Sequence, residues 1–335
     1  MESIRAAICA DEKSSFRGIS FYPAKAPGSF SKEHYGRSYE EYQKACGALG
    51  FTYLKQDYDA ICSAAERFEA DLLIEISRPA AFAAGKARGI PVCSVISAPM
   101  FREAAFPYPI LSGLNEFLRS KDMEQVVRLN DLFRQSEARI CFGPQSFQPI
   151  PPPYFPFRFG FPAILPLSPA KTSRLSIVFG EPSLSTQKTR KIICAAFQGA
   201  PYEVHAYMRN TPMERRDNIR FQNRFLLSAL NGSSVCIHDG NETIMLYCLA
   251  LGIPQVIVHD GSYQRSWNAA CVRRAGIGRS LAEENFSMER LYETYRAVLA
   301  CDDYEIRSRA LRDETMRLGD LSAFSGILPA EPLSL

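Results

Sequence analysis

The residues whose types and spacing could do chemistry lie in one stretch, residues 233–278. An apolar segment at 235–237 predicts a short buried strand, and the polar turn HDGN at 238–241 follows it directly. Residues 242–251 then carry apolar side chains at helical spacing, and Gly252 ends that pattern. A glycine-containing turn from a buried strand into a helix presents unpaired N–H groups and the positive end of the helix dipole. This arrangement predicts a binding site for a phosphate or diphosphate.

The same stretch continues with a second strand and a second helix. Residues 255–258 predict the strand, and residues 263–274 predict the helix, which Gly276 ends. Gln264 and Asn268 stand four residues apart, so both amide side chains lie on one face of this helix. Such a face either contacts a ligand or is the ordinary polar start of a helix, and the pattern leaves both interpretations open.

Strands and helices alternate along the rest of the chain. Helices are predicted at 38–49, 58–68, 79–88 and 186–197, and strands at 71–76, 89–96, 175–179, 202–207 and 218–221. This alternation implies parallel sheets covered by helices, an α/β fold with two Rossmann-type domains. The proline- and aromatic-rich segment 148–169 predicts a linker rather than a recognition motif for a partner. We therefore predict an N-terminal domain at 1–165 and a C-terminal domain at 166–335.

Composition and charge narrow the class of protein. The chain of 335 residues is long enough for two domain cores, and a net charge of +3 with dispersed Lys and Arg argues against nucleic-acid binding. Ten cysteines without a C-x-x-C pair predict buried thiols rather than disulfides or a metal site. Without a signal peptide or a bilayer-spanning apolar run, a cytoplasmic protein with no transmembrane segment is expected. The apolar cluster at 106–111 leaves a peripheral membrane contact or an apolar acceptor as alternatives to core packing.

The stretch 233–278 resembles the donor-binding half of GT-B nucleotide-sugar glycosyltransferases, a family that includes the UDP-glycosyltransferases. The matching residues are His238, Gly240, Thr243, Gly252-Ile253-Pro254, Gln264 and Asn268-Ala269. The spacing from Gln264 to Ala269 is similar to that of the peptidoglycan N-acetylglucosaminyltransferase. The resemblance implies a GT-B fold, in which two Rossmann-like domains face a cleft. It also implies transfer of a hexosyl or hexosaminyl group from a nucleotide-diphosphate sugar to a small-molecule or lipid-like acceptor, with no metal or other cofactor.

The resemblance places the donor site in the C-terminal domain. The donor-binding residues that it implies are Gly180, His238, Gly240, Asn241, Glu242, Thr243, Gln264 and Asn268. Among them, His238 would contact the diphosphate and Gln264 the sugar. The chain departs from the family at several places, and Tyr263 stands where many relatives have aspartate. Asp239 stands where the family has glycine, and Leu246 and Tyr247 occupy the place of a glutamate that usually holds the ribose.

The catalytic residues that the resemblance implies lie in the N-terminal domain. His34 is the only histidine there and would act as the general base. Glu75 follows a predicted parallel strand at its carboxyl end, where it would orient the base or the acceptor. The ordinary alternatives are a solvated loop histidine and an exposed strand end. The family's first strand–loop–helix unit is either missing or reduced to residues 36–38, so a short N-terminal domain is expected.

Two other functions stay open at this point. A GT-B-like partner or scaffold protein that has lost its donor pocket would carry the same departures, and it would bind a protein partner. A nucleotide-sugar epimerase or hydrolase would need a carboxylate close to the sugar, which Asp260 or Glu242 would have to supply. The donor is thus expected to be a nucleotide sugar, whereas the acceptor is unknown.

Overall fold

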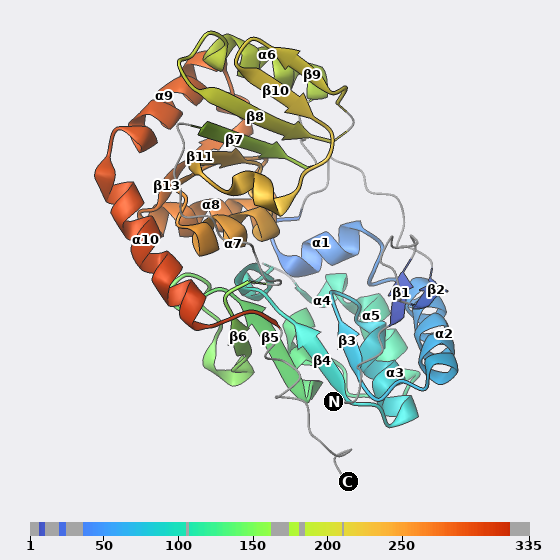
Figure 1. Cartoon of the computed structure of the whole chain (residues 1–335). Coiled ribbons are helices and arrows are strands. Elements are labelled where there is room, and N and C mark those ends of the chain that lie inside the picture. The colour runs from blue at the N-terminus through green and yellow to red at the C-terminus, as the bar shows by residue number, and fades with distance from the viewer. Residues whose placement is uncertain are drawn as a thin grey trace. The chain divides into compact units, whose positions relative to one another are not determined.

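A computed structural model describes residues 7–10, 20–24, 36–104, 107–161, 174–180, 185–209 and 211–321 (Figure 1). The described residues up to Cys141, together with Ile150–Phe157, form one compact unit. Those of Phe142–Pro149 and those from Arg158 onward form a second unit. The sheets are largely parallel, which confirms the predicted α/β class.

A four-stranded sheet has the strand order β3-β4-β5-β6, and β3, β4 and most of β5 belong to the first unit. Its strands are β3 (Leu73–Glu75), β4 (Val92–Val95), β5 (Ala138–Phe142) and β6 (Phe157–Phe159). β3, β4 and β5 run parallel, which confirms the strands predicted at 71–76 and 89–96. A separate pair, β1 (Ala7–Ala10) with β2 (Ser20–Pro23), is also parallel.

The helices of the first unit are α1 (Tyr39–Ala45), α2 (Phe51–Phe68), α3 (Ala80–Arg88), α4 (Pro107–Ile110) and α5 (Ser112–Arg119). Of the three helices predicted in the first unit, α3 has nearly the predicted bounds, α1 ends four residues early and α2 begins seven residues early, whereas α4 and α5 had no predicted bounds. The N-terminus of α1 is capped by Ser38, whose hydroxyl accepts the Glu41 N–H at 3.2 Å. α2 begins at Phe51 rather than at residue 58, because Leu54 and Ile61 belong to one continuous buried face.

Part of the proline-rich segment belongs to the first unit. Residues Pro152–Tyr154 form a 3-10 turn, and the ring of Tyr154 packs against that of Phe101 with 4.6 Å between the ring centroids. Residues 162–169 of this segment lie outside the described residues. Aromatic packing thus holds the turn against the first unit, and the linker role of the segment stays a prediction.

The sheet of the second unit has the strand order β13-β12-β11-β7-β8-β10-β9. Its strands are β7 (Arg174–Phe179), β8 (Glu203–Met208), β9 (Glu214–Arg216), β10 (Ile219–Gln222), β11 (Ser233–His238), β12 (Gln255–His259) and β13 (Gly278–Ala282). All neighbouring strands are parallel except β9 and β10. The chain proceeds outward from β7 to β8 and β10, and then crosses back to place β11 on the other side of β7. Strand order therefore reverses between β7 and β11, the position where ligands bind in open α/β sheets.

Helices cover both faces of this second sheet (Figure 1). They are α6 (Thr186–Phe197), α7 (Glu242–Leu251), α8 (Tyr263–Ala275), α9 (Met288–Leu299) and α10 (Asp302–Arg317). α6 and α9 pack on one face, where Ile177 and Val235 lie in the core, whereas α7 and α8 pack on the other face against Cys236 and Ile257. The bounds of α6 and α7 are those predicted.

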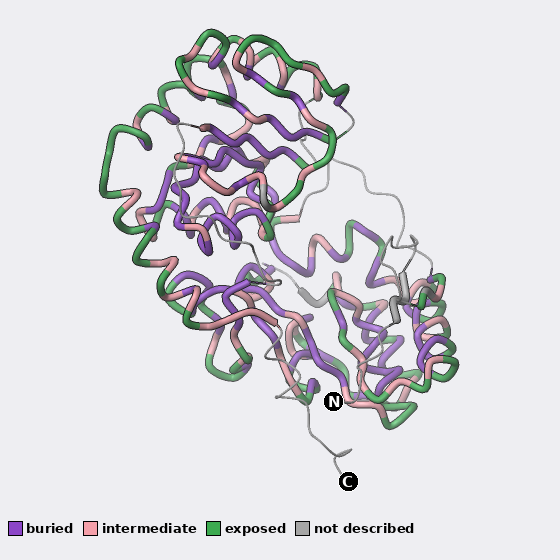
Figure 2. The backbone as a smooth tube through the Cα atoms, in the orientation of Figure 1, coloured by how far each residue is buried: buried purple, intermediate pink, exposed green. Residues whose placement is uncertain are grey.

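The strands of the second sheet are buried along most of their length (Figure 2).

Most of the described cysteines are buried in one or the other unit, including Cys93, Cys236 and Cys248, as the sequence predicts. Among the described helices, none combines the length and the apolar character that a bilayer crossing requires. The carboxyl edge of the second sheet carries the turn at 238–241, which the sequence singles out.

Candidate functional site

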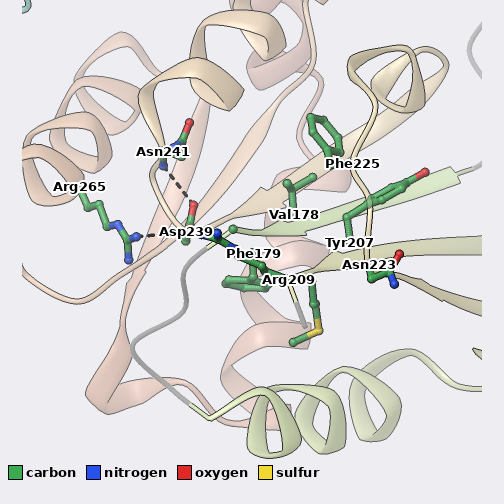
Figure 3. Close-up of a pocket in the computed structure, with 11 residues that line it drawn as sticks. Val178, Phe179, Tyr207, Arg209, Asn223, Phe225, Asp239, Asn241 and Arg265 are labelled. Carbon is green, nitrogen blue, oxygen red and sulfur yellow. Dashed lines mark hydrogen bonds and ion pairs between the residues drawn. The ribbon is translucent and has the colours of Figure 1, made fainter. Parts of the chain in front are cut away.

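A pocket of about 400 Å³ opens at the carboxyl ends of β7 and β8, beside the turn that follows β11 (Figure 3). Gly180 closes β7, Arg209 follows β8, and Asp239 and Asn241 belong to the turn. Arg265, from the first turn of α8, completes the charged part of the lining. The pocket lies where strand order reverses, and its volume falls within the range of small-molecule sites, roughly 300–1,000 Å³.

Arg265 is held between two carboxylates. Its guanidinium lies 3.1 Å from an oxygen of Asp260 and 3.5 Å from an oxygen of Asp239. Both acidic side chains are about 95% buried, with exposed fractions of 4% for Asp239 and 5% for Asp260. Because buried charges are stable only when they are paired, this arrangement fixes the position of the Arg265 side chain against the turn.

His238, the predicted diphosphate ligand, is fully buried at the end of β11 and does not line the pocket. Its Nε2 donates to Oε1 of Gln255 at 2.9 Å, and its Nδ1 accepts the Gly240 N–H at 3.2 Å. Burial lowers the pKa of the ring, which is therefore neutral at pH 7. In this conformation both ring nitrogens are occupied within the protein, so His238 shapes the turn, and contact with a ligand would require these bonds to open.

Gly240 and Asn268 act together to hold the turn against α8. Gly240 has a φ of +85°, and a Cβ there would lie 3.1 Å from Cβ of Arg265 and from Cγ2 of Ile257. The fully buried Asn268 donates from Nδ2 to the Gly240 carbonyl at 2.9 Å. Glycine is thus required both by the backbone conformation and by the close approach of the helix. Neither residue lines the pocket.

Asn241 caps α7 and is also the member of the predicted helix start that lines the pocket. Its Oδ1 accepts the Ile244 N–H at 3.3 Å, and its own N–H donates to Oδ1 of Asp239 at 3.2 Å. Thr243 is exposed in the first turn of α7. The Asn241 N–H, at the N-terminus of α7, is therefore already bonded to the Asp239 carboxylate of the same chain.

Glu242 and Gln264 bond to each other rather than lining the pocket. Nε2 of Gln264 donates to Oε2 of Glu242 at 2.9 Å. Gln264 and Asn268 thus both reach the turn from α8, which confirms that they share one helix face. The carboxylates considered for an epimerase or hydrolase, Asp260 and Glu242, both have protein partners here.

The structure also shows where Gly180 and the middle of α7 lie, the two other places that the resemblance to the GT-B family singled out. Gly180 lines the pocket, and a Cβ there would lie 3.9 Å from Oδ2 of Asp239, which leaves room for a ligand to approach the backbone. Leu246 and Tyr247, in the middle of α7, are both 2% exposed. The middle of α7 is therefore an apolar packing surface and offers no carboxylate to a ribose.

Glu75 lies at the carboxyl end of β3 in the first unit and is 3% exposed. Its Oε2 accepts the Arg78 N–H at 3.0 Å. Burial raises its pKa from the usual 4.5 to about 7, although the Arg78 N–H and the Ser94 hydroxyl oppose the shift. The alternative of an exposed strand end is therefore wrong for this side chain. His34 lies outside the described residues.

The sequence pattern did not predict that two arginines, Arg209 and Arg265, line the pocket. Arg209 lies two residues after the strand predicted at 202–207 and directly follows β8, so a cation near the carboxyl end of a parallel strand was the signal available. Arg265 adjoins Gln264 but points to the other side, toward Asp239 and Asp260. Its role depends on contacts with residues outside its own helix, which spacing along the chain does not reveal.

No family model and no curated protein matches the sequence. Solved structures do match over 93% of the chain. The kitacinnamycin glycotransferase superposes with a TM-score of 0.71 at 15% identity over 86% of its own length. The spinosyn rhamnosyltransferase SpnG, complexed with thymidine diphosphate, has a TM-score of 0.70 at 16% identity over 87% of its length. The glycosyltransferase VinC, in complex with dTDP, has a TM-score of 0.64 at 16% identity, also over 87%.

The chain has the GT-B fold. Three residues of the pocket lining, Asp239, Asn241 and Arg265, lie within residues 233–278, the stretch whose sequence resembles the GT-B family. Within the described residues, no cluster of three or more His, Cys, Asp or Glu side chains is placed to hold a metal ion. The polar groups of the lining include the guanidinium groups of Arg209 and Arg265, the Asp239 carboxylate and the side-chain amides of Asn223 and Asn241, which can form hydrogen bonds with a polar ligand.

Proposed function

We propose that the protein transfers a sugar from a nucleotide-diphosphate sugar to a small-molecule or lipid-like acceptor. The donor diphosphate binds in the pocket at the carboxyl ends of β7 and β8 and beside the turn after β11. The position of that pocket, at the reversal of strand order in a GT-B chain, is the observation that carries the proposal. Gly180, Arg209 and Asn241 lie where they can contact a diphosphate.

The matched structures support a nucleoside diphosphate as the ligand. VinC is described in complex with dTDP and SpnG with thymidine diphosphate. SpnG is also described with spinosyn aglycone, which supports a small-molecule acceptor as one form of the proposal. We therefore include dTDP beside UDP among the nucleotides to be tested.

The proposed reaction needs charge stabilisation more than covalent help from the protein. An acceptor hydroxyl oxygen attacks the anomeric carbon, the bond from that carbon to the diphosphate oxygen breaks, and the nucleoside diphosphate leaves. Cationic and N–H groups fixed around the leaving group stabilise its developing charge, a contribution that Arg209 would make here. The hydroxyl proton passes to the general base, for which the resemblance names His34, and Glu75 is the candidate to orient that base or the acceptor.

Calorimetric titration with UDP and with dTDP tests the donor site. The protein should bind at least one of them, and Arg209→Gln should weaken that binding about tenfold or more, because a charge-assisted contact is lost. Arg224→Gln is the matched control: Arg224 is an exposed arginine that lies between the pocket residues Asn223 and Phe225 but does not line the pocket. A folded protein that binds neither nucleotide would contradict the proposal.

The second candidate is a GT-B scaffold that no longer binds a donor. The pairing of Arg265 with Asp239 and Asp260 favours it, because its guanidinium is already paired with two carboxylates of the chain itself. Sugar transfer from a UDP- or dTDP-linked donor to an apolar acceptor, followed by mass spectrometry of the products, separates the two. Product formation excludes the scaffold, whereas tight nucleotide binding without product would argue for a binding protein.

A further inference from the structure

Asp239 places a buried carboxylate where the proposed donor would place a phosphate. Its side chain lines the pocket between Asn241 and Arg265 and contacts both (Figure 3). One oxygen accepts the Asn241 N–H, so it occupies an amide at the N-terminus of α7, the end of a helix that attracts anions. The other oxygen lies 3.5 Å from Arg265 and faces Gly180 across the pocket.

The charges around the pocket consequently cancel. Arg209 and Arg265 each contribute one positive charge to the lining, and Asp239 contributes one negative charge. Asp260, bonded to the far side of the Arg265 guanidinium, contributes a second negative charge. Among these described residues the formal charges sum to zero, so they offer a diphosphate no net positive charge, and within a partly buried site a like charge at contact distance is strongly unfavourable.

We infer that Asp239 is a specificity-determining residue that competes with the donor diphosphate for Arg265 and for the N-terminus of α7. This inference rests on the proposed function. A nucleoside diphosphate must displace or move the Asp239 carboxylate, so its affinity is held below that of the same pocket without this charge. A ligand with less negative charge at this position is disfavoured less. The same competition weakens the hold on the nucleoside diphosphate that remains after transfer, which favours its release.

Asp239→Asn isolates the charge from the shape. Asparagine keeps the acceptor for the Asn241 N–H and nearly the same volume but carries no charge. In calorimetric titrations at pH 7.5, this variant should bind UDP or dTDP at least about tenfold more tightly than the unmodified protein, and UMP with a smaller gain. Asp239→Ser, a smaller neutral residue with a hydroxyl acceptor, repeats the test if the first variant does not fold.

Asp260→Asn is the matched control. It also removes one carboxylate from Arg265, but the Asp260 side chain does not line the pocket. The Asp239 carboxylate therefore still competes with the diphosphate for Arg265 and for the N-terminus of α7. We expect a gain of less than about threefold for this variant, since the competing anion stays in place. An equal gain in both variants would overturn a competition specific to Asp239 and leave only a general charge effect.

The outcomes separate the inference from the proposed function. If the unmodified protein binds and Asp239→Asn binds no more tightly, the inference is wrong and the proposed function stands. If only the Asp239 variants bind, the inference holds and the native chain is closed to donors, in line with the scaffold candidate. If every folded variant binds neither UDP nor dTDP, both the proposed function and the inference fail.

Discussion

The side-chain amide of Asn268 donates to the backbone carbonyl of Gly240 at 2.9 Å, across 28 residues of sequence. This one bond ties α8 to the turn between β11 and α7. Asn268 is fully buried, so its amide has no access to water as a substitute partner. The wall of the pocket is therefore held by a residue that does not itself face the pocket.

Replacing Asn268 with Ala should lower the free energy of unfolding by about 1–3 kcal/mol, because the buried Gly240 carbonyl loses its partner. Urea denaturation of the purified variant measures this change. Gln264→Ala is a suitable control on the same helix face, since its partner Glu242 is only half-buried and can bond to water. A loss for Asn268→Ala no larger than that for Gln264→Ala would contradict the role assigned to this bond.

Replacing Gly240 with Ala should be more harmful than the same change at Gly261. Both glycines have a positive φ, +85° and +81°, so the backbone strain of an L residue is similar, about 1 kcal/mol. A Cβ at Gly240 would meet Arg265 and Ile257 at 3.1 Å, whereas at Gly261 nothing lies within 4 Å. The extra destabilisation, about 1–3 kcal/mol, reports the overpacking against α8. Thermal unfolding of the two variants side by side gives the comparison, and equal melting temperatures would refute it.

Glu75 should make the stability of the protein depend on pH above pH 4.5. Its folded-state pKa of about 7 lies above the usual 4.5, so its contribution to stability is complete below pH 4.5 and is lost as the pH rises through 7. The shift corresponds to about 3 kcal/mol, since one pKa unit is about 1.4 kcal/mol. Glu75→Gln should therefore gain stability relative to the unmodified protein between pH 5 and pH 8.

Urea unfolding of Glu75→Gln at several pH values measures that gain. Glu116→Gln is the control, because Glu116 is an exposed carboxylate on α5 of the same unit. Its difference from the unmodified protein should stay flat over the same pH range. A flat difference for Glu75→Gln as well would mean that the carboxyl is not protonated at neutral pH in the folded protein.

Local signals predicted much of the second unit. α6 and α7 have the predicted bounds because each begins at a side-chain cap, Ser185 or Asn241, and α7 ends at Gly252 with a φ of +67°. β9 escaped prediction, since Glu214–Arg216 has no apolar residue and is a strand only through its pairing with β10. The early start of α2 escaped for a similar reason, because its buried face is set by packing.

The site was predictable in place but not in detail. A strand followed by a glycine turn and a helix located the turn at 238–241, and the pocket lies beside it. Which side chains face the pocket depends on distant partners: Gln255 turns His238 inward, and Asp260 helps to direct Arg265. Asp239 was identified only as a departure from a pattern, and its place in the lining follows from the three-dimensional arrangement.

The order of the strands in the second sheet has a consequence for synthesis of the chain. β7 emerges early, yet the turn after β11 is braced by Gln255 on β12 and by Asn268 on α8. A ribosome must therefore release residues beyond Asn268 before the brace can form: a nascent chain that stops at α7 has neither partner, and one that stops at the end of β12 has only Gln255. Ligand-assisted folding would therefore act only after most of the chain has left the ribosome.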